Sequence, residues 1–203
     1  MIELKGITKQ YGDFLAVDNL NLTVAEGEIF GFLGPNGAGK TTTIKMIAGV
    51  LEPSAGSVTI GGFDMLKQPE AAKQKIGFIP DRPYLYEKLT GMEFLKFTAE
   101  LYNVPQDVYR QKARKNLEMF SLADWSDELI ESYSHGMKQR LIMSAALLHE
   151  PRVFVVDEPL VGLDPKGARL IKRIFSKLKD SSLTVFMSTH TLEIAEELCD
   201  RIG

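Results

Sequence analysis

The fold of this 203-residue chain is decided by one stretch of sequence, Gly34-Pro35-Asn36-Gly37-Ala38-Gly39-Lys40-Thr41. Four residues separate its first and last glycines, and Lys-Thr follows, which is the complete pattern of a phosphate-binding P-loop. Glycines let the backbone approach a phosphate closely, and the N–H groups at the start of the next helix attract its negative charge. A glycine-rich turn that serves packing alone is the competing interpretation.

The flanking residues favour the phosphate site. Glu28–Leu33 is more continuously apolar than the earlier strand-like segments, as in a buried strand, and Thr42–Val50 has apolar residues at helical spacing. A strand, a glycine loop and a helix begin an α/β unit. We expect Lys40 to bind the outer phosphates and the Thr41 hydroxyl to bind Mg²⁺. The residues expected to bind the nucleotide here are Gly34, Pro35, Asn36, Gly37, Ala38, Gly39, Lys40, Thr41 and Thr42.

Two carboxylates follow a second apolar strand. Val153–Val156 is apolar throughout, and Asp157 and Glu158 come directly after it. Ligands of open α/β sheets bind at the carboxyl ends of the strands. We predict that Asp157 holds Mg²⁺, directly or through water, and that Glu158 orients or deprotonates an attacking water. The alternative is that both residues are solvated acids at the end of a strand, without a role in binding or catalysis.

The rest of the chain indicates a mixed architecture. Residues 2–5 and 20–24 alternate apolar with polar, as half-exposed antiparallel strands do. Thr90 and Glu93 form a capping-box pattern, and residues 90–134 read as helical. Apolar strands between helices in the last third predict a parallel sheet covered on both faces.

The predicted fold class is therefore α/β: a P-loop NTPase core with a mainly parallel sheet, an N-terminal antiparallel β subdomain and an inserted helical subdomain. We predict one domain over residues 1–203. Residues 1–89 and 135–203 would form the ATP-binding core with its antiparallel part, and residues 90–134 the helical subdomain.

Composition excludes some classes of function. The formal net charge is −3 and 25% of residues are charged, so nothing in the charge balance favours nucleic acid as a partner. The single cysteine, Cys199, rules out an internal disulfide and fits a reducing cytosol. No segment approaches the roughly 18 apolar residues of a spanning helix, and residues 1–5 do not begin a leader. We expect any transmembrane part to belong to another chain.

Further motifs follow in a fixed order. Tyr133-Ser134-His135-Gly136-Met137-Lys138-Gln139-Arg140 resembles the signature sequence of ABC transporter nucleotide-binding domains, Val161–Asp164 resembles their D-loop, and Ser188–His190 resembles their switch region. Tyr11 matches the aromatic residue that stacks on adenine in this family. With the P-loop and the two carboxylates, the resemblance covers nearly the whole chain and is closest to the export-like type.

The resemblance implies an ATP hydrolase with ATP and Mg²⁺ as cofactors. Two such domains associate head to tail, so that Ser134 and the N–H groups near Gly136 contact the γ-phosphate held by the other copy. A serine that caps a helix suits this role, because the free N–H groups there attract anions. Tyr11 would stack on the adenine.

The catalytic residues implied by the resemblance are Lys40, Glu158 and His190. Glu158 would act on the water, and His190 would hold the γ-phosphate. Asp164 would link the two sites of the dimer, and its position before Pro165 also makes it a helix N-cap. A structural histidine at a strand end is the alternative for His190.

The partners implied are a transmembrane permease subunit and a second nucleotide-binding domain, identical or not, with no nucleic acid. The expected location is peripheral, at the cytoplasmic face of a membrane, and cytoplasmic when isolated. The alternative function is a soluble ABC ATPase in translation or DNA maintenance, which one cassette without sustained heptads disfavours. A non-catalytic regulatory cassette is disfavoured by the intact catalytic residues. The cargo cannot be read from the sequence, and the direction favoured by resemblance is export.

The sequence departs from the family pattern at three places. Asp81 stands where the family usually has glutamine, and we predict that its carboxylate lies near Mg²⁺; a surface acid is the alternative. His135 and Met137 replace a glycine and a glutamine of the signature, and we expect an exposed His135 without a catalytic role. The family normally continues beyond the equivalent of Gly203, so we expect a truncated C-terminus.

The loop around Asp81 to Lys88 is predicted to dock on the membrane partner, together with the helical lobe. The docking segment within this loop is Pro83-Tyr84-Leu85-Tyr86. Tyrosines and apolar side chains are common anchors of interfaces. The alternative places Leu85 and one tyrosine in the core.

Overall fold

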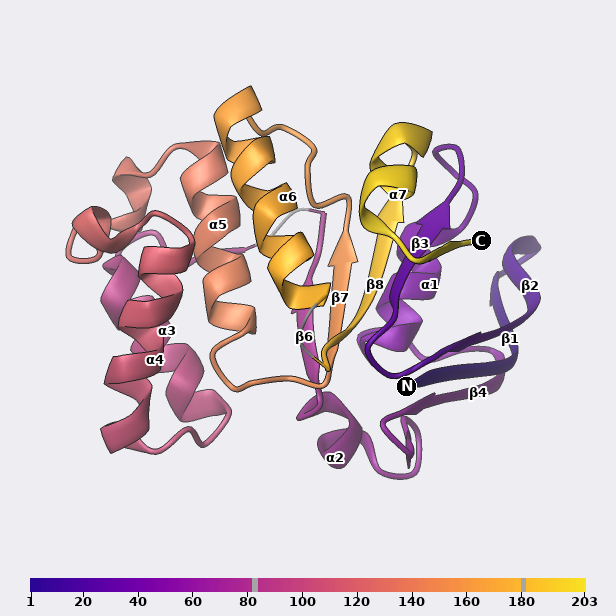
Figure 1. Cartoon of the computed structure of the whole chain (residues 1–203). Coiled ribbons are helices and arrows are strands. Elements are labelled where there is room, and N and C mark those ends of the chain that lie inside the picture. Colours follow the sequence, from indigo (N-terminus) through magenta and orange to yellow (C-terminus); the bar gives the residue numbers. More distant parts are fainter. Residues whose placement is uncertain (82–83, 180–181) are drawn as a thin grey trace. The chain divides into compact units, whose positions relative to one another are not determined.

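The computed structural model describes residues 1–81, 84–179 and 182–203 (Figure 1). The chain forms two compact units. The first consists of Met1–Asp81, Arg152–Pro159 and Ser176–Gly203, and the second of Arg82–Pro151 and Leu160–Phe175.

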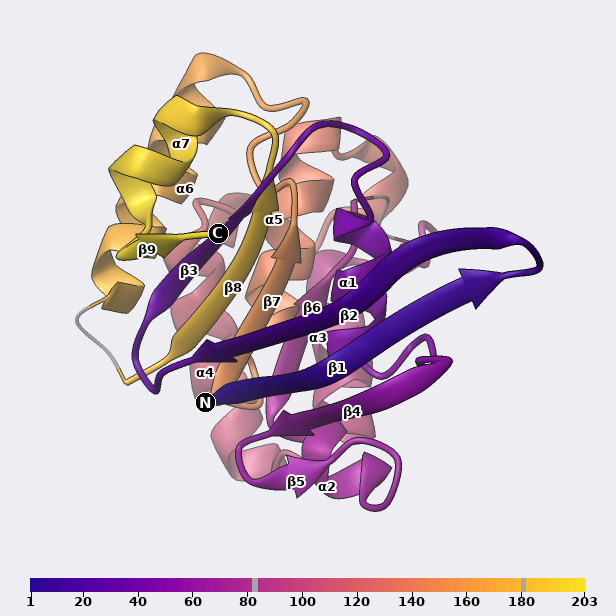
Figure 2. The same cartoon turned by 90° about the vertical axis from the view of Figure 1, so that its right-hand side faces the viewer.

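An antiparallel sheet in the order β2-β1-β4-β5 opens the first unit (Figure 2). Its long strands are β1 (Ile2–Tyr11) and β2 (Phe14–Val24), which pair as a hairpin. The sheet is completed by β4 (Ala55–Ile60) and β5 (Phe63–Asp64). The predicted antiparallel subdomain is confirmed; β1 continues beyond the predicted end at residue 5, and β2 begins before the predicted start at residue 20. The alternation of buried and exposed residues in β1 places one face of the hairpin on the core.

The remaining strands of the first unit form a parallel sheet in the order β6-β7-β8-β3-β9. Its members are β3 (Ile29–Leu33), β6 (Ile76–Ile79), β7 (Val153–Asp157), β8 (Thr184–Thr189) and β9 (Arg201–Ile202). Every residue of β7 and β8 is buried, as expected for a parallel sheet covered on both faces. Because β3, β7 and β8 are parallel neighbours, the segments that follow them emerge at one edge of the sheet.

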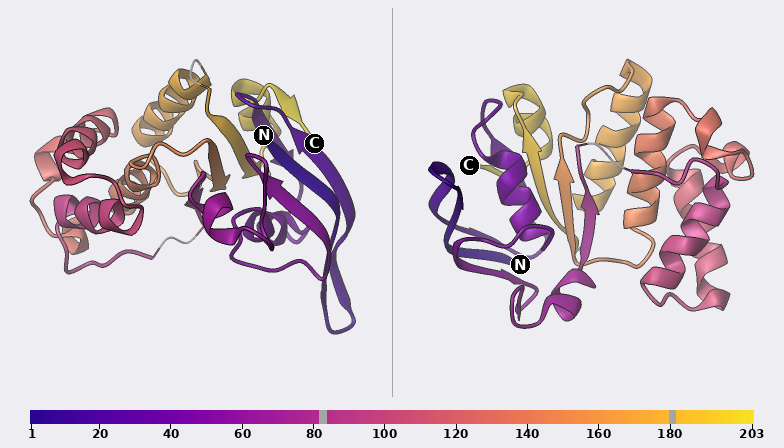
Figure 3. Two further views of the ribbon diagram at one scale, coloured as in Figure 1. Left: turned by 90° about the horizontal axis from the view of Figure 1, so that it is seen from below. Right: turned by 180° about the vertical axis from the view of Figure 1, so that it is seen from behind.

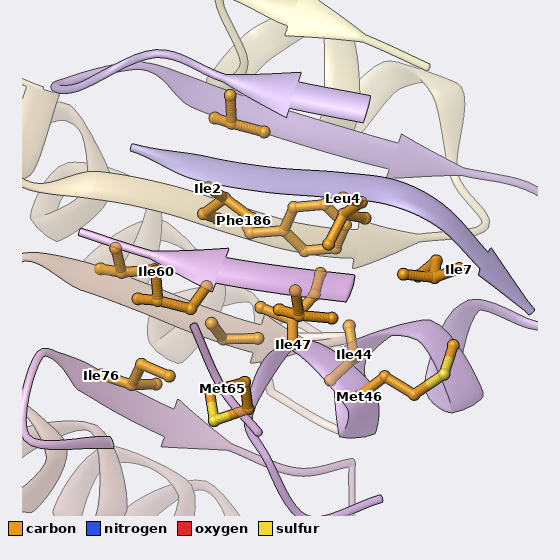
Figure 4. Close-up of a cluster of buried hydrophobic side chains, with 14 of the residues drawn as sticks. Ile2, Leu4, Ile7, Ile44, Met46, Ile47, Ile60, Met65, Ile76 and Phe186 are labelled. Atoms are coloured by element: carbon orange, nitrogen blue, oxygen red, sulfur yellow. The ribbon is translucent and has the colours of Figure 1, made fainter. Parts of the chain in front are cut away.

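Helix α1 (Lys40–Ile47) lies between the two sheets, and its apolar side chains join their cores (Figures 3 and 4). Ile44 and Ile47 are fully buried and lie among side chains of β1, β4 and β8. The labelled members of this cluster are Ile2, Leu4, Ile7, Ile44, Met46, Ile47, Ile60, Met65, Ile76 and Phe186. The packing fixes the start of α1 relative to the parallel sheet, and thereby places the P-loop.

The remaining helices of the first unit are short. They are α2 (Pro69–Lys73) and α7 (Leu192–Leu198). Within the described residues, no helix is both long and apolar enough to cross a bilayer.

The second unit is helical. It contains α3 (Gly91–Leu101), α4 (Gln106–Met119), α5 (His135–Ala146) and the start of α6 (Pro165–Lys179). Two 3₁₀ turns, η1 (Ala123–Trp125) and η2 (Ile130–Ser132), lie between α4 and α5. The capping box at the start of α3 is complete: the Thr90 N–H donates to the Glu93 carboxylate, and the Glu93 N–H donates to the Thr90 hydroxyl.

The compact units divide the chain differently from the expected boundary after residue 134. Helix α5 and the first part of α6 belong to the helical unit, whereas the sequence analysis assigned residues 135–203 to the ATP-binding core. The functional assignment of residues 90–134 as a separate subdomain stays a prediction.

Candidate functional site

The P-loop joins β3 to α1 through two glycines with left-handed backbone. Gly37 has φ +85 and Gly39 has φ +86. A Cβ on Gly39 would lie 2.5 Å from the carbonyl oxygen of Ala16 on β2, whereas nothing lies within 4 Å of a Cβ on Gly37. Gly39 is therefore required both by the backbone and by the packing of β2 against the loop. Gly37 is required by the backbone alone.

Lys40 is held inside this loop. Its side chain is 7% exposed, and its Nζ donates hydrogen bonds to the carbonyl oxygens of Gly34, at 2.6 Å, and Pro35, at 3.0 Å. Two carbonyl oxygens are weaker partners for a buried ammonium than an anion is. The loop therefore presents a positive charge that a phosphate can recruit.

The two carboxylates follow β7 on the same edge of the sheet. Asp157 is 2% exposed and pairs in register with Ser188 of β8. The Ser188 hydroxyl donates to Asp157 Oδ1 and accepts a hydrogen bond from the backbone N–H of Glu158, at 3.1 Å. Glu158 has φ +50, a left-handed conformation that non-glycine residues rarely adopt. This turn directs its carboxylate to Lys40, whose Nζ is 3.9 Å from Glu158 Oε1.

His190 completes the cluster from the end of β8. Its Nδ1 is 3.0 Å from the same Glu158 Oε1. The backbone also ties this segment to the P-loop, because the N–H of Gly34 donates to the carbonyl of Thr189 at 3.3 Å. Lys40, Glu158 and His190 are thus together, as the sequence analysis expected, and the imidazole remains about half exposed.

The residues predicted to hold Mg²⁺ are hard oxygen donors on one edge of the first unit. Asp157 ends β7, Thr41 lies in the first turn of α1, and Asp81 follows β6, which is the neighbour of β7. Carboxylate and hydroxyl oxygens of this kind fit Mg²⁺, which is usually held by one or two carboxylates together with substrate phosphates. The exposed Asp81 stays a predicted ligand.

Tyr11 is the last residue of β1 and is 49% exposed. It faces Phe14 across the turn of the hairpin, and Phe14 is itself 65% exposed. Exposed rings at this tip fit a stacking surface for a base, and the adenine contact of Tyr11 stays a prediction.

The signature residues lie in the second unit. The Ser134 hydroxyl accepts a hydrogen bond from the N–H of Met137 at 3.3 Å, so Ser134 caps α5 as predicted. The exposed His135 lies against the D-loop, because a Cβ on Gly162 would be 2.9 Å from His135 Nε2. Gly136 opens the same helix. The trans contacts of Ser134 and Gly136 with a phosphate stay predictions.

Asp164 caps α6, because its Oδ1 accepts the N–H of Gly167 at 3.0 Å. Burial lowers the pKa of the nearby Arg140 guanidinium, and the charge of Asp164 partly offsets that effect. Arg140 in turn donates to the carbonyls of Gly136 and Phe120, which ties the start of α5 to the end of α4.

The docking segment has one buried and two exposed side chains among its described residues. Leu85 is 8% exposed and belongs to the core, whereas Tyr84 and Tyr86 are 85% and 51% exposed. The expectation that Leu85 helps to form the docking surface is wrong, since its side chain is covered. Pro83 lies outside the described residues.

Ser188 is a site residue whose role the sequence analysis missed. Its hydroxyl joins Asp157 to the backbone of Glu158, and only the register of β7 with β8 reveals this. The signal in the sequence was a serine among apolar residues near the end of a buried strand.

Known proteins resemble this chain in sequence and in structure. The sequence profile of the family described as ABC transporter matches residues 17–161. The chain is 39% identical over its full length to the linearmycin resistance ATP-binding protein of Bacillus subtilis, and 38% identical to the bacitracin transport ATP-binding protein of Bacillus licheniformis. It spans 65% and 66% of the lengths of these two relatives.

A solved structure supports the same assignment. It is the structure of a dimeric ATP-binding cassette in a post-hydrolysis state with ADP and phosphate. The match covers all of this chain and 93% of the cassette's chain, with a TM-score of 0.90 and 27% sequence identity. The fold, the P-loop cluster and these similarities agree, and the chain belongs to the ABC transporter family, with the fold of an ATP-binding cassette.

Proposed function

We propose that the chain binds ATP with Mg²⁺ at its P-loop and hydrolyses it to drive transport through a separate membrane protein. The observation that carries the proposal is the meeting of Lys40, Glu158 and His190 at one edge of the sheet, with Nζ 3.9 Å and Nδ1 3.0 Å from one carboxylate oxygen.

Each residue has a role in this reaction. The γ-phosphate draws Lys40 Nζ away from the carbonyls of Gly34 and Pro35, because a charged acceptor is the stronger partner. Glu158 then loses a competing cation and accepts a proton from the attacking water. His190 holds the γ-phosphate and keeps Glu158 oriented.

Mg²⁺ fits the oxygen donors Thr41 and Asp157, and Asp81 is a further candidate at the carboxyl edge. When bound, the ion neutralises charge on the phosphates. Ser188 keeps the Asp157 carboxylate oriented from the neighbouring strand.

Hydrolysis requires two copies or one copy with a related cassette. Ser134 and the N–H groups at the start of α5 form a capped helix end that suits a phosphate from the other copy. The dimeric state of the related cassette with ADP and phosphate supports this arrangement.

The membrane partner docks on exposed aromatic side chains of the second unit. Tyr84 and Tyr86 meet at 6.0 Å between ring centroids, and Tyr86 meets Phe97 of α3 at 5.3 Å, both edge to face. A row of exposed rings of this kind supplies anchors for an interface. The chain then lies at the cytoplasmic face of a membrane. One relative is named for linearmycin resistance and the other for bacitracin transport, and these names favour export of a toxic compound.

Phosphate release from MgATP by the purified chain tests the proposal. We expect hydrolysis that saturates with ATP and rises more than linearly with protein concentration, since two cassettes form each site. Absence of ATP-dependent phosphate release from the chain, both alone and with its membrane partner, would refute it. Stimulation by nucleic acid or ribosomes instead of by membranes would support the soluble alternative.

A further inference from the structure

Tyr133, the residue before Ser134, has a buried phenol. The side chain is 4% exposed, and its hydroxyl donates a hydrogen bond to the carbonyl of Trp125 in η1. The Trp125 and Tyr133 rings also meet edge to face, with 6.4 Å between centroids. The hydroxyl therefore joins the start of the signature sequence to the turn that follows α4.

Gly91, the first residue of α3, provides the space for this hydroxyl. A Cβ on Gly91 would lie 2.5 Å from Tyr133 Oη, but 3.5 Å from Cζ of the same ring. The φ angle of Gly91 lies outside the left-handed region, so its backbone accepts any residue. The phenol oxygen is the main obstacle to a methyl group here, and the carbonyl oxygen of Ser126, at 3.3 Å from the same Cβ position, is a milder second one.

The segments that meet at Tyr133 are fixed by other contacts. The N–H of Met92 donates to the carbonyl of Ser126 at 2.8 Å, so the turn that accepts the phenol is bonded to the start of α3. The capping box of Thr90 fixes that helix end. The anchor for Tyr133 is therefore rigid on both sides, and Ser134 follows it directly in the chain.

We propose that Tyr133 is a positioning residue, whose hydroxyl, seated over Gly91, holds Ser134 and the first turn of α5 in the geometry that binds the γ-phosphate of a second copy. The proposal rests on the function proposed above. A leucine would fill the apolar space but would leave the carbonyl of Trp125 without this donor. Tyr133 and Gly91 form a matched pair, since the hydroxyl of one needs the missing side chain of the other.

The test measures ATP-driven dimerisation in a Glu158→Gln background, by light scattering over a range of ATP concentrations. We expect Tyr133→Phe to raise the ATP concentration at half-dimerisation about threefold to tenfold, from the loss of one hydrogen bond. Nucleotide affinity of the monomer should stay unchanged, because the P-loop lies in the other unit. Tyr109→Phe, at a tyrosine of α4 with 6% exposure, is the matched control and should change neither quantity.

Substitution of Gly91 distinguishes a positioning role of Tyr133 from a general loss of stability. Gly91→Ala should impair dimerisation more than Tyr133→Phe does, because the methyl group meets the phenol oxygen. In the double variant the oxygen is absent, so Gly91→Ala should be tolerated far better than in the Tyr133 background. Denaturant unfolding should show the same dependence of one substitution on the other.

Two results would overturn the proposal: a Tyr133→Phe variant that dimerises at the parent's ATP concentration, or equal effects of Gly91→Ala in both backgrounds. A parent Glu158→Gln chain that binds ATP but associates neither with itself nor with a related cassette of its host would instead refute the proposed function. The two failures are distinguishable because the first needs a parent that dimerises.

Discussion

One carboxylate oxygen, Glu158 Oε1, is shared by His190 Nδ1 at 3.0 Å and Lys40 Nζ at 3.9 Å. The groups come from three different segments, which follow β7, β8 and β3. The polar cluster is therefore built from side chains that three strand ends position, and we expect a bound phosphate to replace interactions that these groups make with one another. Such preorganisation limits the reorganisation that the reaction requires.

The first prediction concerns the buried ammonium of Lys40 and its effect on MgATP affinity. Lys40→Ala should weaken MgATP binding about tenfold to hundredfold, since hydrogen bonds to charged groups are lost. Titration calorimetry measures the affinity. Lys45→Ala, at an exposed lysine of the same helix, is the control and should bind as the parent does. Parent-like affinity in Lys40→Ala would remove Lys40 from the phosphate site.

The two left-handed glycines of the P-loop should respond differently to alanine. Gly37→Ala should lower the free energy of unfolding by about 1–2 kcal/mol, from backbone strain alone. Gly39→Ala should lower it by about 3 kcal/mol or more, because its methyl group also meets the Ala16 carbonyl. Denaturant unfolding checks the order, and an equal loss in both variants would contradict the packing of β2 on the loop.

The fall of the unfolding free energy at alkaline pH should depend on the buried phenol of Tyr133. Burial, together with the charges of Asp127 and Glu128, raises the pKa of its phenol from 10.0 to about 12. The folded state therefore holds this proton more tightly than the unfolded state. Its stabilisation is fully present below pH 10 and is lost as the pH rises toward 12. Tyr133→Phe should show a shallower fall of unfolding free energy over this range, and identical slopes would contradict the buried phenol.

The exposed tyrosines are expected to matter for docking alone. Replacing Tyr84 and Tyr86 by serine should release the chain from membranes of its host while MgATP affinity stays constant. Leu101→Ser, at a residue of α3 with 63% exposure, is the control for loss of an exposed apolar group. Leu85→Ser should instead lower the free energy of unfolding by about 2–5 kcal/mol, because that side chain is buried. Unchanged membrane sedimentation of the double tyrosine variant would contradict the docking surface.

Much of the fold followed from local patterns. The P-loop with its flanking strand and helix, the capping box at Thr90, and the paired acids after Val153–Val156 each specify structure within a few residues. Strands β4 and β5 were not predicted, because β5 has two residues and a glycine interrupts the apolar pattern of β4. Gly56 has φ +85 and lies against the carbonyl of Gly6, a contact that only the pairing of distant strands creates.

The unpredicted parts of the site depend on register and burial. The bond between Ser188 and Asp157 arises because the two residues pair across β7 and β8, and no spacing in the sequence encodes that register. The covering of Leu85 between two exposed tyrosines likewise depends on tertiary packing. Gly91 resembled an ordinary helix start, because the phenol that excludes its side chain is 42 residues away in the chain.

Glu158 is the group that we assign to act on water beside the phosphate site, and the hydrolysis rate of Glu158→Gln is the measurement that tests this role. The amide is nearly isosteric but cannot accept the proton, so kcat should fall about 10²- to 10⁴-fold while ATP affinity is retained. Glu26→Gln, at an exposed glutamate, is the control. Phosphate release by Glu158→Gln at the parent's rate, with ATP bound equally well, would contradict the central claim.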